Sequence, residues 1–360
     1  MSGSISHPLG ILSALPSAQA TPAGAGAIAN PMRLDAPVKV TICFTESCNL
    51  DCTYCYADCR PQRKARELTA PQWLEFIDRA LADGVVCVYF EGGEPFHRPD
   101  FPQVLEACTR RAFTMVRSNA TLIDRERADW LASIGLGTLY VDLLGARAET
   151  HDALTGTAGS HARSLDGIRA AVEAGLDTQL LFILNRRNAA ELPEYLTLAA
   201  SLGVSAVGIL RLYPLGRAKR RWGELALSLD EMMAAIEAIE APEGLRIMQS
   251  WHPNDANCCW QMAAVNAFGD SIGCAYLREY VNYGNILDTS LAETWRHPLC
   301  RELRSGRVEA SCGECSDSQG SHGGCRSTAF AFHRRFDAPD PFDRTINRGV
   351  DLRVLPDWLL

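Results

Sequence analysis

Three cysteines in the stretch ESCNLDCTYCYADC are spaced so that their thiolates can share one metal centre. Cys48, Cys52 and Cys55 follow the pattern C-x3-C-x2-C, and Cys59 lies four residues further on. A structural zinc site needs four ligands, usually as two pairs. A redox C-x2-C pair would leave Cys48 without a role. A [4Fe–4S] cluster on three thiolates keeps one iron open to another ligand, so the spacing favours an iron–sulfur site that does chemistry.

The elements around this loop indicate an α/β fold. Short, nearly continuous apolar runs alternate with helical patterns, as in a parallel sheet covered by helices. Six such units predict an open sheet or a partial (β/α)6 barrel, because a closed barrel of this type has eight. We expect strands at 38–44, 85–90, 113–118, 138–144, 178–184 and 206–213, and helices at 69–84 (capped by Thr69), 124–134, 164–174 and 191–201.

Polar segments stand where the predicted strands end. The cysteine loop follows the first strand, EGGEP (91–95) ends the second, and RSNAT (117–121) ends the third. Active sites of parallel α/β folds lie at this edge of the sheet. Adjacent glycines let the backbone approach a ligand closely, and a carboxylate such as that of Glu94 can accept from an ammonium group. The three segments together predict one ligand site.

The cysteine motif after the first strand, with GGEP after the second, resembles the radical S-adenosylmethionine (SAM) superfamily. In that family the open iron binds the amino and carboxylate groups of SAM. An electron from the cluster then cleaves SAM to a 5′-deoxyadenosyl radical, which abstracts hydrogen from the substrate. The resemblance gives Cys59 no role. It implies SAM contacts from Tyr54 (toward the adenine), Gly92, Gly93, Glu94, Pro95, Ser118, Asn119 and Asp142, the last standing where many relatives have serine.

Cysteines gather again near the C-terminus, with seven between 258 and 325. This segment resembles the SPASM extension of radical SAM enzymes, which carries auxiliary [4Fe–4S] clusters. Ser321 and Asp343 replace two cysteines of that pattern, so the resemblance implies at least one auxiliary cluster, as in the shorter twitch version. Its expected ligands are Cys258 or Cys259, Cys274, Cys312 and Cys315.

Three alternatives stay open for this segment. Cys325 either ligates the auxiliary cluster or stands near the substrate as a hydrogen-atom donor. A second auxiliary cluster would need Asp343 or Ser321 as an oxygen ligand, or Cys300 as a substitute. On spacing alone, the segment could instead be a tail stapled by zinc.

The expected organisation is a lead-in at 1–36, a radical SAM core at 37–249, a SPASM/twitch-like module at 250–345 and a tail at 346–360. The lead-in is rich in Ala, Gly, Pro and Ser, and we expect disorder there. The tail is expected to pack back through Leu355, Trp358 and Leu359.

The net charge and the cysteine content indicate which partners and which cellular compartment to expect. The net charge of −8 argues against non-specific binding of nucleic acid. The basic run 217–221 (RAKRR) is expected to be solvated. There is no apolar run of membrane length and no secretion signal. Fourteen cysteines without such a signal indicate a reducing compartment, hence the cytoplasm.

The resemblance implies an oxidative modification of a peptide, either a cross-link or a dehydrogenation. The alternatives are a dehydrogenase or epimerase of a small sugar or aminocyclitol, and, more remotely, an electron carrier without catalysis. Expected partners are an electron donor such as flavodoxin or ferredoxin and, for a peptide substrate, a separate leader-peptide-binding protein. The 36-residue start is too short to contain a leader-binding domain.

Overall fold

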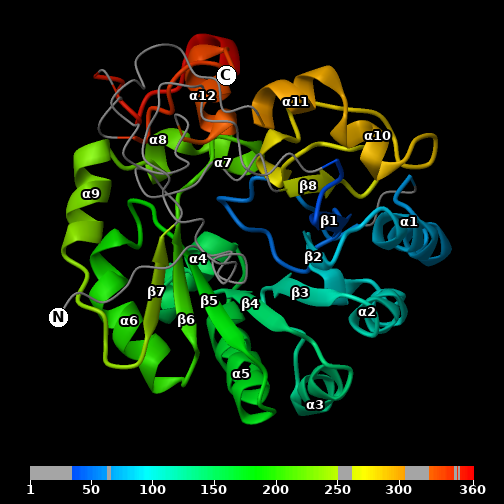
Figure 1. Ribbon diagram of the computed structural model, residues 1–360. Coiled ribbons are helices and arrows are strands. Elements are labelled where there is room, and N and C mark those ends of the chain that lie inside the picture. The colour runs from blue at the N-terminus through cyan, green and yellow to red at the C-terminus, as the bar shows by residue number, and fades with distance from the viewer. Residues whose placement is uncertain (1–34, 63–65, 250–261, 305–323, 344–346, 348) are drawn as a thin grey trace, which may run out of the picture.

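The computed structural model describes residues 35–62, 66–249, 262–304, 324–343, 347 and 349–360 (Figure 1). The predicted lead-in lies almost wholly outside these residues. Five of the predicted or alternative auxiliary ligands lie outside them as well: Cys258, Cys259, Cys312, Cys315 and Ser321.

One parallel sheet of eight strands organises the described chain. Its order is β7-β6-β5-β4-β3-β2-β1-β8, so the strands follow the sequence except that β8 returns to lie beside β1. All six predicted strands are present, and the prediction for β3 matches residue for residue. The strands are β1 (Lys39–Thr45), β2 (Cys87–Gly92), β3 (Phe113–Ser118), β4 (Thr138–Asp142), β5 (Thr178–Ile183), β6 (Ala206–Leu210), β7 (Arg246–Gln249) and β8 (Met262–Val265).

Helices follow the strands and cover the outer face of the curved sheet, as Figure 1 shows for α1, α2, α3, α5 and α6. Thr69 caps α1 as predicted, and Gln72 completes a capping box by accepting from the Thr69 backbone. The helices are α1 (Ala70–Ala82), α2 (Phe101–Thr109), α3 (Arg125–Ser133), α4 (Ala148–Thr155), α5 (Ser160–Glu173), α6 (Leu192–Ser201), α7 (Gly216–Arg220), α8 (Trp222–Leu225), α9 (Leu229–Glu237), α10 (Leu291–Trp295), α11 (Pro298–Arg304) and α12 (Arg326–His333).

The two faces of the sheet carry different side chains. On the outer face, Phe44 of β1 packs against Trp73 of α1 and Phe101 of α2, with ring centroids 5.7 and 4.9 Å apart. A second, smaller apolar cluster contains Met115, Tyr140, Leu181, Ala206 and Met248, from β3 to β7. Since side chains alternate along a strand, these residues line the inner face, below the strand ends.

The C-terminal part of the chain is built onto the sheet. β8 pairs in parallel with β1, so the segment predicted as a second module supplies a strand to the core sheet. The tail packs back as predicted. Leu355 and Leu359 are buried, and the Trp358 ring lies 5.6 Å from that of Phe330. No helix among the described residues is long and apolar enough to cross a membrane.

Candidate active site

The loop that follows β1 brings the three predicted cysteines to one cavity of about 70 Å³. Backbone hydrogen bonds fix the loop on two sides. The Cys48 N–H donates to Arg60 O (2.8 Å), and the Thr53 N–H donates to Leu154 O at the end of α4 (2.8 Å). The cavity wall includes most of the predicted site: Cys48, Cys52, Tyr54, Cys55, Gly92, Gly93, Ser118, Asn119 and Asp142.

Burial keeps two of these thiols protonated when no metal is bound. Burial, and next the charge of Glu94, raise the pKa of Cys48 to about 12. Burial, and next the thiolates of Cys48 and Cys55, raise the pKa of Cys52 well above its usual value. Coordination to a metal would remove these protons, because a coordinating thiol is deprotonated outright. No three described His, Cys, Asp or Glu side chains are grouped as ligands of a single ion. A multi-iron cluster, in which each thiolate binds a different iron, suits this arrangement.

The GGEP segment approaches the cysteine loop closely. A Cβ on Gly93 would lie 2.0 Å from the backbone oxygen of Ser47, so only glycine fits there. The Gly93 N–H donates to Thr45 O (2.7 Å) and the Glu94 N–H to Ser47 O (2.8 Å). Pro95 begins the short helical turn Pro95–His97. The segment thereby joins the end of β2 to the start of the cysteine loop.

Glu94 ties the ends of β2 and β3 together. Its carboxylate is fully buried and accepts from Ser118 Oγ (3.0 Å), the Asn119 N–H (2.8 Å) and the Phe96 N–H (3.1 Å). Burial raises the pKa of Glu94 to about 7. Glu94 and Pro95 are not among the residues that line the cavity. In this structure Glu94 positions Ser118 and Asn119, and its predicted contact with the SAM amino group stays a prediction.

Asn119 lies against the cysteine loop. Its side-chain Nδ2 donates to Asn49 Oδ1 (2.9 Å) and lies 4.0 Å from Cys48 Sγ. Tyr54 is mostly buried in the main apolar core beside Cys52. Both residues line the cavity, as the predicted contacts with SAM require, but those contacts stay predictions.

Three charged side chains line the cavity at the ends of neighbouring strands. Arg117 of β3 makes a two-pronged ion pair with Asp142 of β4, with Nε and Nη2 at 2.9 and 2.8 Å from the carboxylate oxygens. Its Nη1 lies 3.6 Å from Glu91 of β2. Sequence reasoning identified Asp142 but missed Glu91 and Arg117, although both flank the motifs that it used. The partner of Asp142 on the cavity wall is therefore Arg117.

Three tyrosines connect the cysteine loop with the second module. Tyr56, next to Cys55, donates from its hydroxyl to Glu91 Oε1 (3.0 Å). Its ring centroid lies 4.9 Å from that of Tyr276, which stacks on Tyr213 at 3.8 Å. Tyr276 is two residues after Cys274. The contacts place Cys274, a predicted auxiliary ligand that is 5% exposed, close to the radical site.

Asp340 anchors Cys325 beside the barrel. Its carboxylate accepts from Arg211 Nη1 (2.5 Å), the Cys325 N–H (2.8 Å) and Thr328 Oγ1 (2.7 Å). Burial alone would raise the pKa of Asp340, but Arg211 and the other donors hold it below its usual value. The backbone of Cys325 is therefore fixed near the end of β6, which suits either of its predicted roles.

The remaining alternatives for a second cluster differ in their surroundings. Cys300 lies in α11, buried in the main apolar core. Asp343 is fully buried three residues after Asp340. Ser321 lies outside the described residues, as do Cys258, Cys259, Cys312 and Cys315.

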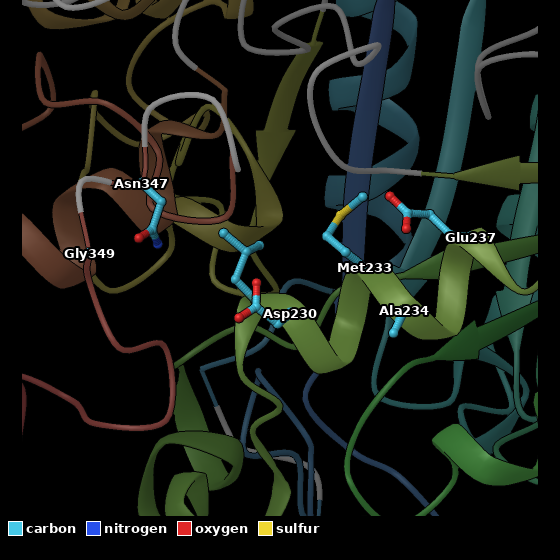
Figure 2. A pocket seen from close by; sticks show the side chains of 7 residues that line it. Asp230, Met233, Ala234, Glu237, Asn347 and Gly349 are labelled. Atoms are coloured by element: carbon cyan, nitrogen blue, oxygen red, sulfur yellow. The ribbon is translucent and has the colours of Figure 1, made fainter.

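A second hollow of about 490 Å³ lies along α9. Figure 2 shows Asp230, Met233, Ala234 and Glu237 on α9, with Asn347 and Gly349 on a separate segment. Its lining contains no cysteine or histidine and shares no residue with the cysteine cavity.

Comparison with known proteins decides the family. A model of the radical SAM superfamily matches residues 42–199, and one described as an iron–sulfur cluster-binding domain, SPASM, matches residues 258–316. Mycofactocin maturase MftC of Mycobacterium tuberculosis is 30% identical over 329 residues, which cover 86% of this chain and 83% of that protein. The chain belongs to the radical SAM superfamily. It is an enzyme of that family, and its cofactors are SAM, the [4Fe–4S] cluster and auxiliary iron–sulfur centres of the SPASM type.

Other relatives of this radical SAM enzyme match over most of its length. PqqA peptide cyclase of Gluconobacter oxydans is 27% identical over 346 residues, which cover 90% of this chain and 97% of that protein. The crystal structure of Streptococcus suis SuiB bound to S-adenosylmethionine superposes with a TM-score of 0.71 at 17% identity, covering 87% of this chain and 77% of that one. The predicted fold class, a partial barrel followed by a SPASM-type module, is confirmed.

Proposed function

We propose that this radical SAM enzyme oxidises a peptide, forming a cross-link or a double bond. One observation carries the proposal. The chain aligns over 86% and 90% of its length with two relatives, a mycofactocin maturase and a PqqA peptide cyclase, and the latter is named for its peptide substrate. The matches include the C-terminal module, so the likeness is not confined to the SAM-binding half.

The chain's own residues would divide the work as follows. Cys48, Cys52 and Cys55 hold the cluster that binds SAM. Cys274, with cysteines outside the described residues, holds an auxiliary cluster. When bound, these cofactors supply the 5′-deoxyadenosyl radical and an acceptor for the second electron of the oxidation.

The cavity wall also offers groups for the substrate and the released proton. A two-electron oxidation of the peptide removes one hydrogen atom, one electron and one proton. The proton is the last group for which the enzyme must supply an acceptor. Glu91 and Asp142 are carboxylates on the wall, and either can accept that proton. Arg117 holds both carboxylates in place, so we assign it a positioning role.

The reaction also needs partners. We propose an electron donor of the flavodoxin or ferredoxin class, which supplies the electron for SAM cleavage. A separate protein that binds the leader part of the peptide is a second expected partner.

A mass-spectrometric assay tests the peptide substrate. The reconstituted protein is incubated anaerobically with SAM, a reductant and a short peptide encoded beside its gene. We expect the peptide to lose two hydrogen atoms and 5′-deoxyadenosine to form in equal amount. Peptide carrying deuterium at the reacting carbon should pass the label to 5′-deoxyadenosine.

Two results would contradict the proposal. The first is an unchanged peptide together with turnover of an aminocyclitol or sugar, which would support the small-molecule alternative. The second is a change of stereochemistry without a change of mass, which would support epimerisation, with Cys325 as the hydrogen donor.

A further inference from the structure

Two features without a role in the reaction contact Cys55. One is Cys59, the fourth cysteine of the loop. The other is Arg217, the first residue of the basic run 217–221. Arg220 and Arg221 are solvated as predicted, with side chains 53% and 44% exposed, but Arg217 is only 8% exposed. The expectation that the run is solvated is therefore wrong for Arg217.

Arg217 holds the cysteine loop in place through three contacts. Its backbone N–H donates to Cys55 O (2.8 Å). In its guanidinium, Nη2 donates to Cys59 O (2.9 Å) and Nη1 forms an ion pair with Asp51. Helix α7 can come this close because it begins with glycine. A Cβ on Gly216 would lie 2.6 Å from the backbone oxygens of both Cys55 and Tyr56. One guanidinium thus bridges the loop on both sides of Cys52 and Cys55.

The guanidinium also acts on the Cys55 thiolate through its charge. The guanidinium forms a side-chain hydrogen bond with Cys55. Attraction between the two is strong because both groups are largely shielded from water.

Cys59, which lines the cavity, adds further donors to Cys55. It is 1% exposed, and its N–H lies 3.5 Å from Cys55 Sγ. Its thiol also hydrogen-bonds to the Cys55 side chain.

We propose that Arg217 and Cys59 are positioning residues that stabilise the reduced form of the cluster held by Cys48, Cys52 and Cys55. Reduction adds one negative charge to a cluster that already carries three thiolates. Hydrogen bonds to the ligand sulfurs and a buried cation both favour the more negative state, and so raise the reduction potential. The proposal rests on cluster binding and is independent of the substrate.

A redox titration of the full-length reconstituted protein tests this directly. The SAM-responsive paramagnetic signal is followed against potential in wild type, Arg217→Gln and Cys59→Ala. We expect the equilibrium constant for reduction to fall by at least about tenfold in Arg217→Gln, which is about 59 mV for one electron. Cys59→Ala should shift the potential in the same direction by less.

Matched variants separate the proposed role from simple packing. Cys59→Ser keeps a donor at the same place and should return the potential toward wild type, whereas a packing role would make serine no better than alanine. Arg220→Gln changes an exposed arginine of the same helix and should leave the potential unchanged. Arg217→Lys keeps the charge and should lie between Arg217→Gln and wild type.

The proposal is overturned if Arg217→Gln and Cys59→Ala, loaded with iron as wild type is, titrate at the wild-type potential. If Arg217→Gln does not take up iron, the proposal is tested by the reduction potentials of Arg217→Lys, Cys59→Ala and Cys59→Ser. Equal potentials in those three variants and wild type would also overturn it.

Discussion

Replacing Glu94 by alanine is expected to reduce SAM cleavage by about 100-fold, because displacement of reacting groups by about an ångström costs that much. Glu94 is fully buried, and its carboxylate is the acceptor for Ser118, Asn119 and Phe96. Without it, two backbone N–H groups at the ends of β2 and β3 lose their partner, at a cost of about 1–3 kcal/mol each. The rate of 5′-deoxyadenosine formation and the midpoint of urea unfolding measure the two effects.

The pH dependence of stability provides a second measure of Glu94. Burial raises its pKa to about 7 from the 4.5 of an exposed glutamate, so the folded state holds the proton more tightly. Its contribution to the free energy of unfolding is therefore full below about pH 4.5 and is lost as pH rises through about 7. We expect Glu94→Gln, which cannot ionise, to lack this part of the pH dependence. If Glu94→Gln and wild type lose stability in parallel between these pH values, the assigned pKa is wrong.

Replacing Cys274 by alanine is expected to separate SAM cleavage from product formation. Cys274 is the predicted auxiliary ligand that the tyrosine contacts place near the radical site. Its loss should lower the iron content by about four per chain, since a [4Fe–4S] cluster needs its thiolates. We expect 5′-deoxyadenosine still to form while the oxidised product disappears, because the second electron has lost its acceptor. Iron analysis and product mass spectrometry on the same sample measure both.

Cys300→Ala is the matched control for Cys274→Ala. Both cysteines are 5% exposed, lie in the C-terminal part of the chain and belong to the main apolar core, but Cys300 is inside helix α11, whereas Cys274 is two residues before Tyr276. We expect its iron content and product yield to equal those of wild type. Loss of iron from Cys300→Ala, with none lost from Cys274→Ala, would exchange the roles of the two residues.

The sequence predicts those parts of the site that depend on residues close together in the chain. The apolar run 113–118 becomes β3 without change of bounds, and the capping signal at Thr69 starts α1. The cysteine spacing and the segments after β1, β2 and β3 meet at one cavity because parallel strands bring their carboxyl ends to one edge.

The parts that were missed depend on partners far apart in sequence. β7 and β8 have only four residues each, too few for a recognisable period, and pairing with β6 and β1 makes them strands. Arg217 looks like its neighbours in the basic run, and only the approach of α7 to Cys55 distinguishes it. The burial of Glu91 and Arg117 likewise follows from their pairing across strands.

Iron content with SAM cleavage, measured on wild type and on the variant Cys48→Ala/Cys52→Ala/Cys55→Ala, tests the central claim most directly. After anaerobic reconstitution we predict about eight irons per chain in wild type and about four in the variant, with no 5′-deoxyadenosine formed by the variant. About twelve irons in wild type would mean that Asp343, Ser321 or Cys300 completes a further cluster. About four in wild type and none in the variant would remove the auxiliary cluster from the mechanism. An unchanged iron content in the variant, with SAM still cleaved, would contradict the assignment of the site itself.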